Sequence, residues 1–226
     1  MASIARVHAP AGNRAVLITT LAIPLTGWTV HALSLHRKLA AARRDPLTGL
    51  LGRDGYTAKA RQITARYGDS SLVVVVDLDH FKDVNDGPGG HAAGDRVLAV
   101  TAQRLTAWAG GHGAVGRLGG DEFALAVRIA PARRLLRLAQ LYALLAQPVE
   151  ADDGVLVDTA ASIGAASPDA IGTNDLELLQ RAADAAMYEG KHTGRAVLAG
   201  PQHAAVPSIN GRRAGRPGTH SLGRAA

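Results

Sequence analysis

The sequence of 226 residues contains no cysteine, which excludes both a disulfide framework and a thiolate metal site. Acidic residues are missing from both ends: residues 1–44 carry six Lys or Arg, and residues 200–226 carry four Arg. Taking these ten from the 25 basic residues leaves 15 against all 19 acidic residues in between, a balance of −4. The net charge of +6 therefore comes from the ends, and no specific nucleic-acid binding is predicted for the middle.

Residues 15–35 also lack Asp, Glu, Lys and Arg, a run long enough to cross a bilayer as one helix. A membrane anchor, a cleaved signal peptide and a soluble helix that pairs with a second copy are three interpretations, of which we favour the anchor. Basic residues are more numerous after the run than before it, so the positive-inside rule places the following domain in the cytoplasm. A wholly cytoplasmic chain is the alternative.

These features divide the chain into four parts. Residues 1–14 form an N-terminal tail, and residues 15–44 form the expected transmembrane helix and a connecting helix. Residues 45–198 form the folded domain. Residues 199–226 are rich in Gly, Pro, Ser and Arg, a composition that predicts a disordered basic tail.

Hydrophobic periodicity predicts the elements of the domain. Asp45 and Pro46 are expected as the N-cap and first turn of a helix, and a strand is expected from Val155 to Ala166. The other helices are predicted over residues 56–67, 81–86, 95–108, 131–146 and 175–188. This order of strands and helices predicts an α+β domain.

A run of four valines predicts a buried central strand over residues 72–79 that ends in Asp77 and Asp79. We expect these two acids to point to opposite faces of the sheet. Because unpaired buried charge is costly, binding of a metal ion would explain acids at this position. Oxygen ligands favour a hard cation, Mg²⁺ or alternatively Mn²⁺.

A second pair of acidic residues follows Gly119-Gly120. These two glycines lie between two apolar segments and are a signal for a two-residue hairpin turn. Asp121 and Glu122 come directly after this turn. Such a turn can bring backbone close to a phosphate and carboxylates close to a divalent cation. By itself the turn equally suits an acidic surface hairpin, and it is the combination with the valine strand that favours a functional site.

Together with four further stretches, these segments resemble the GGDEF-domain diguanylate cyclases over about residues 45–198. The resemblance implies the ferredoxin-like palm of nucleotide cyclases, preceded by one N-terminal helix. It also implies that two facing protomers condense two GTP into cyclic di-GMP and release two pyrophosphates. The six stretches, in the family's order, are residues 45–50, residues 77–86, Gly90-His91 with Gly94-Asp95, residues 117–123, residues 162–164, and residues 183–188 with Lys191, Gly194 and Arg195.

The resemblance also assigns roles to single residues. Asp121 and Glu122 would be catalytic, with Asp121 helping to take the proton of the attacking hydroxyl. The metal ligands that it implies are oxygen atoms of Asp77, the Leu78 backbone, Asp121 and Glu122. The residues that would contact GTP are Phe81, Lys82, Asn85, Asp95, Lys191 and Arg195.

Asn85 and Asp95 would read guanine in the family, since an amide and a carboxylate complement the donors and acceptors of that base. The helix predicted over residues 81–86 would turn its first N–H groups toward phosphates. Each side chain also has a purely structural interpretation: an Asx turn for Asn85, an N-cap for Asp95, and a helix C-terminus that favours cations for Lys191 and Arg195.

Two loops depart from the family's pattern. The three residues 87–89 stand where the family usually has two, which favours an alternative function: a module that binds GTP or a cyclic dinucleotide and signals through dimerisation. Many family members carry an inhibitory product site, an Arg-x-x-Asp motif, before the hairpin. Its two charged positions are Gly110 and Gly113 here, so we expect no product inhibition through this loop.

Overall fold

The computed structural model describes residue 28, residues 44–151 and residues 154–204. The chain divides into two units, residues 1–42 and 43–226. The predicted transmembrane and connecting helices lie outside the described residues, apart from Trp28 and Arg44. Within the described part of the chain, no helix is both long and apolar enough to cross a membrane. All elements below belong to the second unit.

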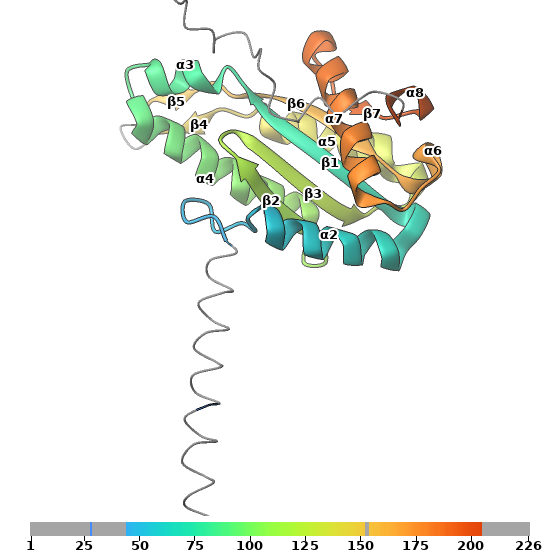
Figure 1. Cartoon of the computed structure of the whole chain (residues 1–226). Helices are drawn as coiled ribbons and strands as arrows, with labels where there is room; N and C mark the ends of the chain where they lie inside the picture. Colours follow the sequence, from blue (N-terminus) through green and yellow to red (C-terminus); the bar gives the residue numbers. More distant parts are fainter. Residues whose placement is uncertain (1–27, 29–43, 152–153, 205–226) are drawn as a thin grey trace, which may run out of the picture. The chain divides into compact units, whose positions relative to one another are not determined.

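A five-stranded sheet, in the order β2-β3-β1-β6-β7, forms the centre of this unit (Figure 1). Neighbouring strands pair antiparallel, except that β6 and β7 are parallel. The position of β3 between β1 and β2 is that of a split β-α-β unit, which confirms the predicted α+β, ferredoxin-like fold. The strands are β1 (Ser71–Asp79), β2 (Ala114–Gly119), β3 (Glu122–Arg128), β6 (Ala160–Ala166) and β7 (Val197–Leu198).

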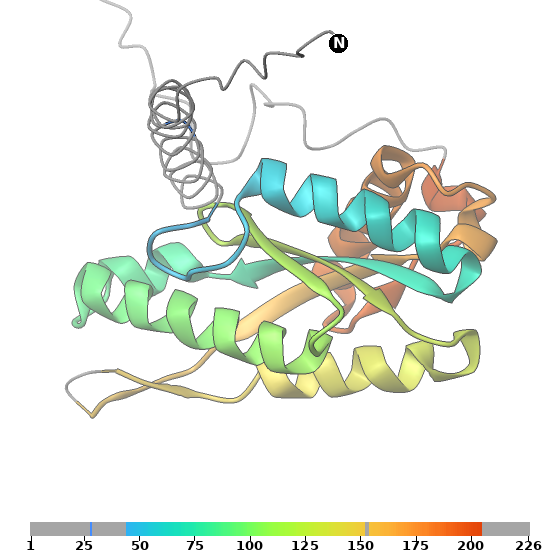
Figure 2. The ribbon, with the colours of Figure 1, turned by 90° about the horizontal axis from the view of Figure 1, so that it is seen from below.

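Helices cover both faces of the sheet (Figure 2). Because side chains alternate along a strand, Val73 and Val75 of β1 pack into the cluster that contains α2 and α7. Val74 and Val76 pack into the opposite cluster, with α4 and α5. The valine run is therefore buried on both sides, as predicted. The four helices are α2 (Arg53–Tyr67), α7 (Leu176–Thr193), α4 (Gly90–Ala109) and α5 (Arg134–Leu145).

Short elements connect these layers. The strands β4 and β5 pair with each other apart from the main sheet. The short elements are α3 (Phe81–Asp86), α6 (Pro168–Ile171), α8 (Pro201–Ala204), the 3-10 turns η1 (Gly68–Ser70) and η2 (Pro131–Arg133), β4 (Val149–Glu150) and β5 (Leu156–Val157).

The expectation that Asp45 begins a helix is wrong. Its carboxylate does accept hydrogen bonds from the backbone N and the Oγ1 of Thr48, at 2.8 and 2.6 Å. Gly49 then adopts φ 69°, a left-handed conformation that ends the turn, and α2 begins only at Arg53. The predicted strand over residues 155–166 is also interrupted, because β5 ends at Val157 and β6 begins at Ala160.

The ordered domain extends beyond the predicted boundary at residue 198. Ala199 and His203 are buried, and α8 packs against α7. Gly200 N donates to His203 Nδ1 at 3.0 Å, and His203 Nε2 lies 3.1 Å from Glu189 Oε2. The first residues of the predicted tail are thus part of the fold, and residues 205–226 lie outside the described residues.

Candidate functional site

Two strand ends bring acidic residues together at one end of the sheet. In the antiparallel pairing of β1 with β3, Asp77 stands directly opposite Glu122. The backbone N–H of Leu78 donates to the carbonyl of Asp121 at 3.3 Å. The end of the valine strand therefore meets the start of β3 just after the glycine turn, which is the neighbourhood on which the sequence-based hypothesis depends.

Asp77 and Asp79 lie on the same face of the sheet, so the expectation that they point to opposite faces was wrong. Residues two apart in a strand share a face, and Leu78 between them packs into the core on the other side. Lys191 Nζ lies 2.9 Å from Asp77 Oδ1 and 3.7 Å from Asp79 Oδ1. Asp79 therefore joins the site, and the Asp-x-Asp spacing was the signal that could have identified it.

Lys191 lies beside Asp77 and Asp79 because its helix, α7, packs very close to the sheet. A Cβ on Gly164 of β6 would lie 2.0 Å from the carbonyl oxygen of Ala183 and 2.2 Å from Met187 N, so a larger residue could not be accommodated there. Asp175 caps the N-terminus of the helix by accepting from Glu177 N at 2.8 Å. Lys191 stands in the last turn of the same helix.

Lys191 and Ser162 partner the two aspartates of β1. Ser162 Oγ donates to Asp79 Oδ1 at 2.7 Å. Partial burial lowers the pKa of Lys191, but its hydrogen bond to Asp77 and the charges of Asp77, Asp79 and Asp121 outweigh this effect and hold the pKa above its ordinary value. Asp77 is 5% exposed, so the lysine compensates a carboxylate that would otherwise be costly to bury.

The residues predicted to read guanine lie on neighbouring helices. A Cβ on Gly94 of α4 would lie 2.0 Å from Asn85 Oδ1 and 3.3 Å from Phe81 Cζ, so this glycine permits close approach of α3 to α4. Asp95 follows Gly94 and is exposed. Residues 87–90 close as a turn in which Gly90 N donates to Gly87 O at 3.0 Å. The three residues 87–89 therefore lie in a closed turn between α3 and α4, and Asn85 lies beside Gly94, the residue before Asp95.

Lys82 and Arg195 are exposed at the ends of two helices, where a ligand can reach them. Lys82 stands in the first turn of α3, which follows His80 at φ 56°, a conformation uncommon outside glycine that turns the chain from strand to helix. Arg195 follows Gly194, whose φ of 64° ends α7.

The acids provide oxygen donors without forming a complete metal cage. In residues 44–151 and 154–204, no group of three or more Asp, Glu, His or Cys side chains converges closely enough to hold an ion. Mg²⁺ is usually bound through one or two carboxylates and completes its shell with water and substrate phosphates. The donor set therefore fits a hard divalent cation whose coordination a triphosphate completes.

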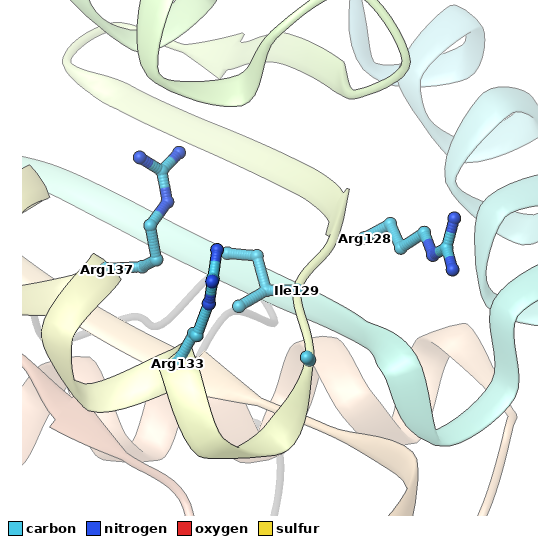
Figure 3. Close-up of a pocket in the computed structure, with 5 residues that line it drawn as sticks. Arg128, Ile129, Arg133 and Arg137 are labelled. Carbon is cyan, nitrogen blue, oxygen red and sulfur yellow. The ribbon is translucent and has the colours of Figure 1, made fainter.

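A cavity of about 320 Å³ lies at the opposite end of the sheet, away from these acids. Arg128, one of its lining residues, pairs with Ser71 at the first position of β1. Figure 3 shows Arg128 turned away from Arg133 and Arg137, so the three guanidinium groups do not converge. We therefore place the candidate site at the acids. The cavity is lined by Arg128, Ile129, Ala130, Arg133 and Arg137.

Related sequences share this domain. A family model described as "Diguanylate cyclase, GGDEF domain" matches residues 42–197. An uncharacterized 19.3 kDa protein of Streptomyces ambofaciens is 47% identical over 173 residues, which are 76% of this chain and 91% of that protein. Diguanylate cyclase TpbB of Pseudomonas aeruginosa is 34% identical over 177 residues, which are 76% of this chain but 40% of TpbB. The chain thus spans less than half of TpbB.

Solved structures of GGDEF domains also match this chain. The GGDEF domain of TpbB superimposes with a TM-score of 0.62 and 33% identity, covering 71% of this chain and 96% of that one. The coiled coil and GGDEF domain of DgcB from Caulobacter crescentus, in complex with c-di-GMP, superimposes with a TM-score of 0.68 and 25% identity, covering 81% and 99%. The chain belongs to the diguanylate cyclase GGDEF-domain family.

Proposed function

We propose that the chain is a diguanylate cyclase that condenses two GTP into cyclic di-GMP and releases two pyrophosphates. Each of two facing protomers holds one GTP, and the 3′-hydroxyl of one attacks the α-phosphorus of the other. The observation that carries this proposal is the register of β1 and β3, which sets Asp77 opposite Glu122 and beside Lys191. Acidic residues at strand ends that pair with a lysine from a distant helix suit a site that binds a charged substrate.

The acids are proposed to hold a divalent metal ion. The ligands are oxygen atoms of Asp77, the Leu78 backbone, Asp121 and Glu122, for one or two Mg²⁺ or alternatively Mn²⁺. When bound, the ion neutralises charge on the triphosphate and acidifies the attacking hydroxyl. Asp121 would take up the proton of the attacking hydroxyl as a general base.

Basic and polar residues around the acids are proposed to position GTP. Lys191 is protonated at neutral pH, as any lysine of ordinary or raised pKa is, and its half-exposed side chain can reach phosphates that approach Asp77. Lys82 and Arg195 add positive charge, and Phe81 contacts the substrate at the start of α3. The guanine is held by Asn85 and Asp95.

Dimerisation and anchoring are part of the same proposal. A site that holds one GTP needs a second copy for a reaction between two GTP, so the active form is a homodimer. We propose that residues 15–35 anchor the chain to the cell membrane in a single pass, with the catalytic domain in the cytoplasm where GTP is available. The alternative is a cytoplasmic chain whose first segment only pairs protomers.

The test is an assay of the purified full chain with GTP and Mg²⁺, with products identified by mass spectrometry. We expect cyclic di-GMP from the wild type, and a loss of about 10³-fold or more in Asp121→Asn and in Glu122→Gln, because each variant removes a charge from the reacting site. Unchanged thermal midpoints would show that both variants fold. Glu177→Gln, which removes an exposed ion pair with Arg61, is the matched acid-to-amide control and should retain full turnover.

Two results would refute the proposal. Turnover retained in either hairpin variant would remove those residues from the mechanism. A wild type that binds GTP without making cyclic di-GMP would favour the nucleotide-binding module.

A further inference from the structure

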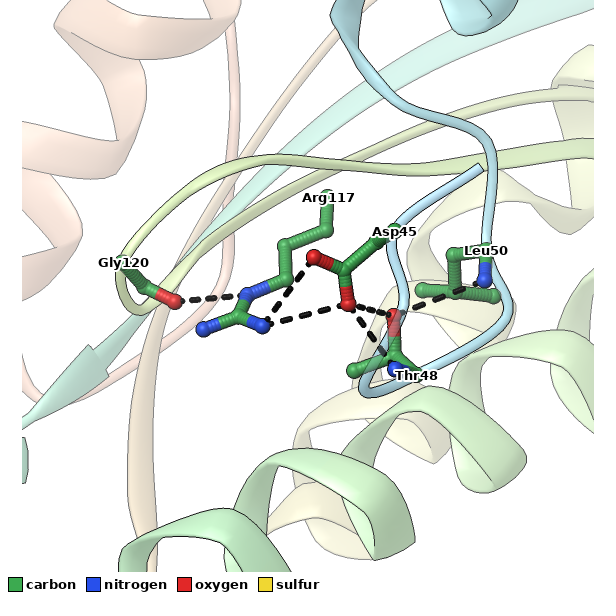
Figure 4. Close-up of polar contacts among 5 residues, drawn as sticks. All are labelled: Asp45, Thr48, Leu50, Arg117 and Gly120. Atoms are coloured by element: carbon green, nitrogen blue, oxygen red, sulfur yellow. Dashed lines mark hydrogen bonds and ion pairs between the residues drawn. The ribbon is translucent and has the colours of Figure 1, made fainter. Parts of the chain in front are cut away.

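A polar contact joins the segment before α2 to the hairpin turn (Figure 4). Arg117 Nη1 lies 3.1 and 3.2 Å from the two carboxylate oxygens of Asp45. The same guanidinium donates from Nε to the carbonyl of Gly120 at 2.8 Å. The side chains of Arg117 and Asp45 are 14% and 19% exposed, so solvent screens this pair less than a surface pair. The Arg117 side chain therefore contacts Asp45, where the chain enters the domain, and Gly120, in the turn that precedes Asp121 and Glu122.

Hydrogen bonds within residues 45–50 hold Asp45 in place independently of Arg117. Besides the two hydrogen bonds from Thr48, its backbone N donates to Leu50 O at 2.8 Å, and Gly49 N donates to its carbonyl at 2.9 Å. Burial raises the pKa of Asp45, but the hydrogen bonds from Thr48 and Arg117 and the charge of Arg117 outweigh this effect and hold the pKa below its ordinary value. Arg117 thus faces a fixed, ionised carboxylate.

The turn itself is not held by side-chain packing at its glycines. Gly119 and Gly120 have φ values of 153° and 52°, and a Cβ built on either would meet no atom within 4 Å. The pairing of β2 with β3 also shifts register between Arg117 and Gly119. Contacts at this turn include backbone pairing, the Arg117 bond to Gly120, a bond from Leu78 N to Asp121 O at 3.3 Å, and a bond from Arg53 Nη2 to Leu118 O at 3.0 Å.

We propose that Asp45 is a positioning residue, which acts through Arg117 to fix the glycine turn and thereby the location of Asp121 and Glu122. The inference rests on the proposed function in assigning those two acids to catalysis. Because the chain enters the domain next to Asp45, a displacement of the preceding segment would be transmitted to the hairpin through this pair. Asp45 touches no reacting group itself, so its loss should change turnover more than binding of GTP.

The first test compares Asp45→Asn with Asp169→Asn. Asp169 is paired with Arg134 at 2.9 Å at the opposite end of the domain, so its variant loses a similar pair remote from the acids. We expect Asp45→Asn to lower kcat about tenfold or more while KM for GTP changes less than about twofold, since small misplacements of catalytic groups are costly. Asp169→Asn should keep the wild-type kcat per folded molecule, and Asp45→Glu should recover part of the loss.

A second readout does not require activity. Hydrogen exchange in Asp45→Asn should accelerate in peptides covering residues 114–124 and remain unchanged in α5 and α7. In an Arg117→Met background, Asp45→Asn should reduce kcat by less than a further twofold, because residues that act through one another are not additive.

Exchange that rises throughout the domain, or independent and multiplicative effects of the two substitutions, would overturn the positioning role. If the wild type makes no cyclic di-GMP, the proposed function fails, whereas the exchange pattern still decides whether Asp45 positions the turn.

Discussion

The two ends of the β1–β3 pair carry charged residues in different ways. At one end, Asp77 faces Glu122 and contacts Lys191, which comes from a helix 114 residues further along the chain. At the other end, the guanidinium of Arg128 lies 5.3 Å from the ring centroid of Tyr67. Two acids and a lysine from distant elements meet at the first end, whereas at the second end Arg128 lies against the face of an aromatic ring.

This difference shows why charge and a cavity together do not identify the site. The cavity lies among the arginines, but Arg137 lies 4.6 Å over the ring of Trp108 and donates to that residue's carbonyl. Arg128 and Arg137 therefore already have structural partners. The acids at the other end carry charge that Lys191 balances in part, and an incoming cation with phosphates can use the same oxygens.

The largest effect expected from this comparison is at Lys191. Lys191→Met should lower kcat/KM for GTP by about tenfold to a hundredfold, because it removes a cation beside the phosphates. It should also lower the thermal midpoint, since Asp77 would keep a buried charge without its partner. Steady-state kinetics and thermal unfolding measure the two effects.

The loss of stability should not depend on pH between about pH 7 and about pH 9. The pKa of Lys191 is raised in the folded state, so its contribution is full below its unfolded value and is lost only as the pH rises through the folded value. If Lys191→Met kept wild-type turnover, the lysine would not act on the substrate, and its role would be limited to pairing with Asp77.

A smaller effect is expected at the arginine end. Arg137→Ala should reduce the free energy of unfolding by about 1 kcal/mol, because it loses the contact with Trp108 and a hydrogen bond to a carbonyl. Its kcat per folded molecule should equal that of the wild type. Chemical denaturation and the cyclase assay test the two statements, and a strong fall in kcat would contradict the assignment of this end to stability.

The smallest effect is expected in the loop between α4 and β2, near the arginine end. Gly110 and Gly113 offer no charged side chain to a product, so we expect added cyclic di-GMP to inhibit the wild type and His112→Ala equally, or neither. Initial rates at increasing product concentration measure this. Inhibition of the wild type that disappears in His112→Ala would show that the loop binds product after all.

Local pattern determined much of this protein from the sequence alone. The valine run predicted a strand buried on both faces, the spacing of Gly119-Gly120 predicted the hairpin, and residues 81–86 predicted α3 with its observed bounds. These features depend on side-chain periodicity and turn chemistry, which act over a few residues. The family motifs then pointed to the acids at the strand ends.

The tertiary structure decided which groups meet. Arg117 contacts Asp45 across 72 residues, and Lys191 contacts Asp77 across 114, because strand register and helix docking bring these side chains together. Asp45 could equally have capped a helix, and only the conformation of Gly49 and the contact with Arg117 made it part of a turn. Such pairings depend on the whole packed domain, since each is set by elements that no local stretch of sequence contains.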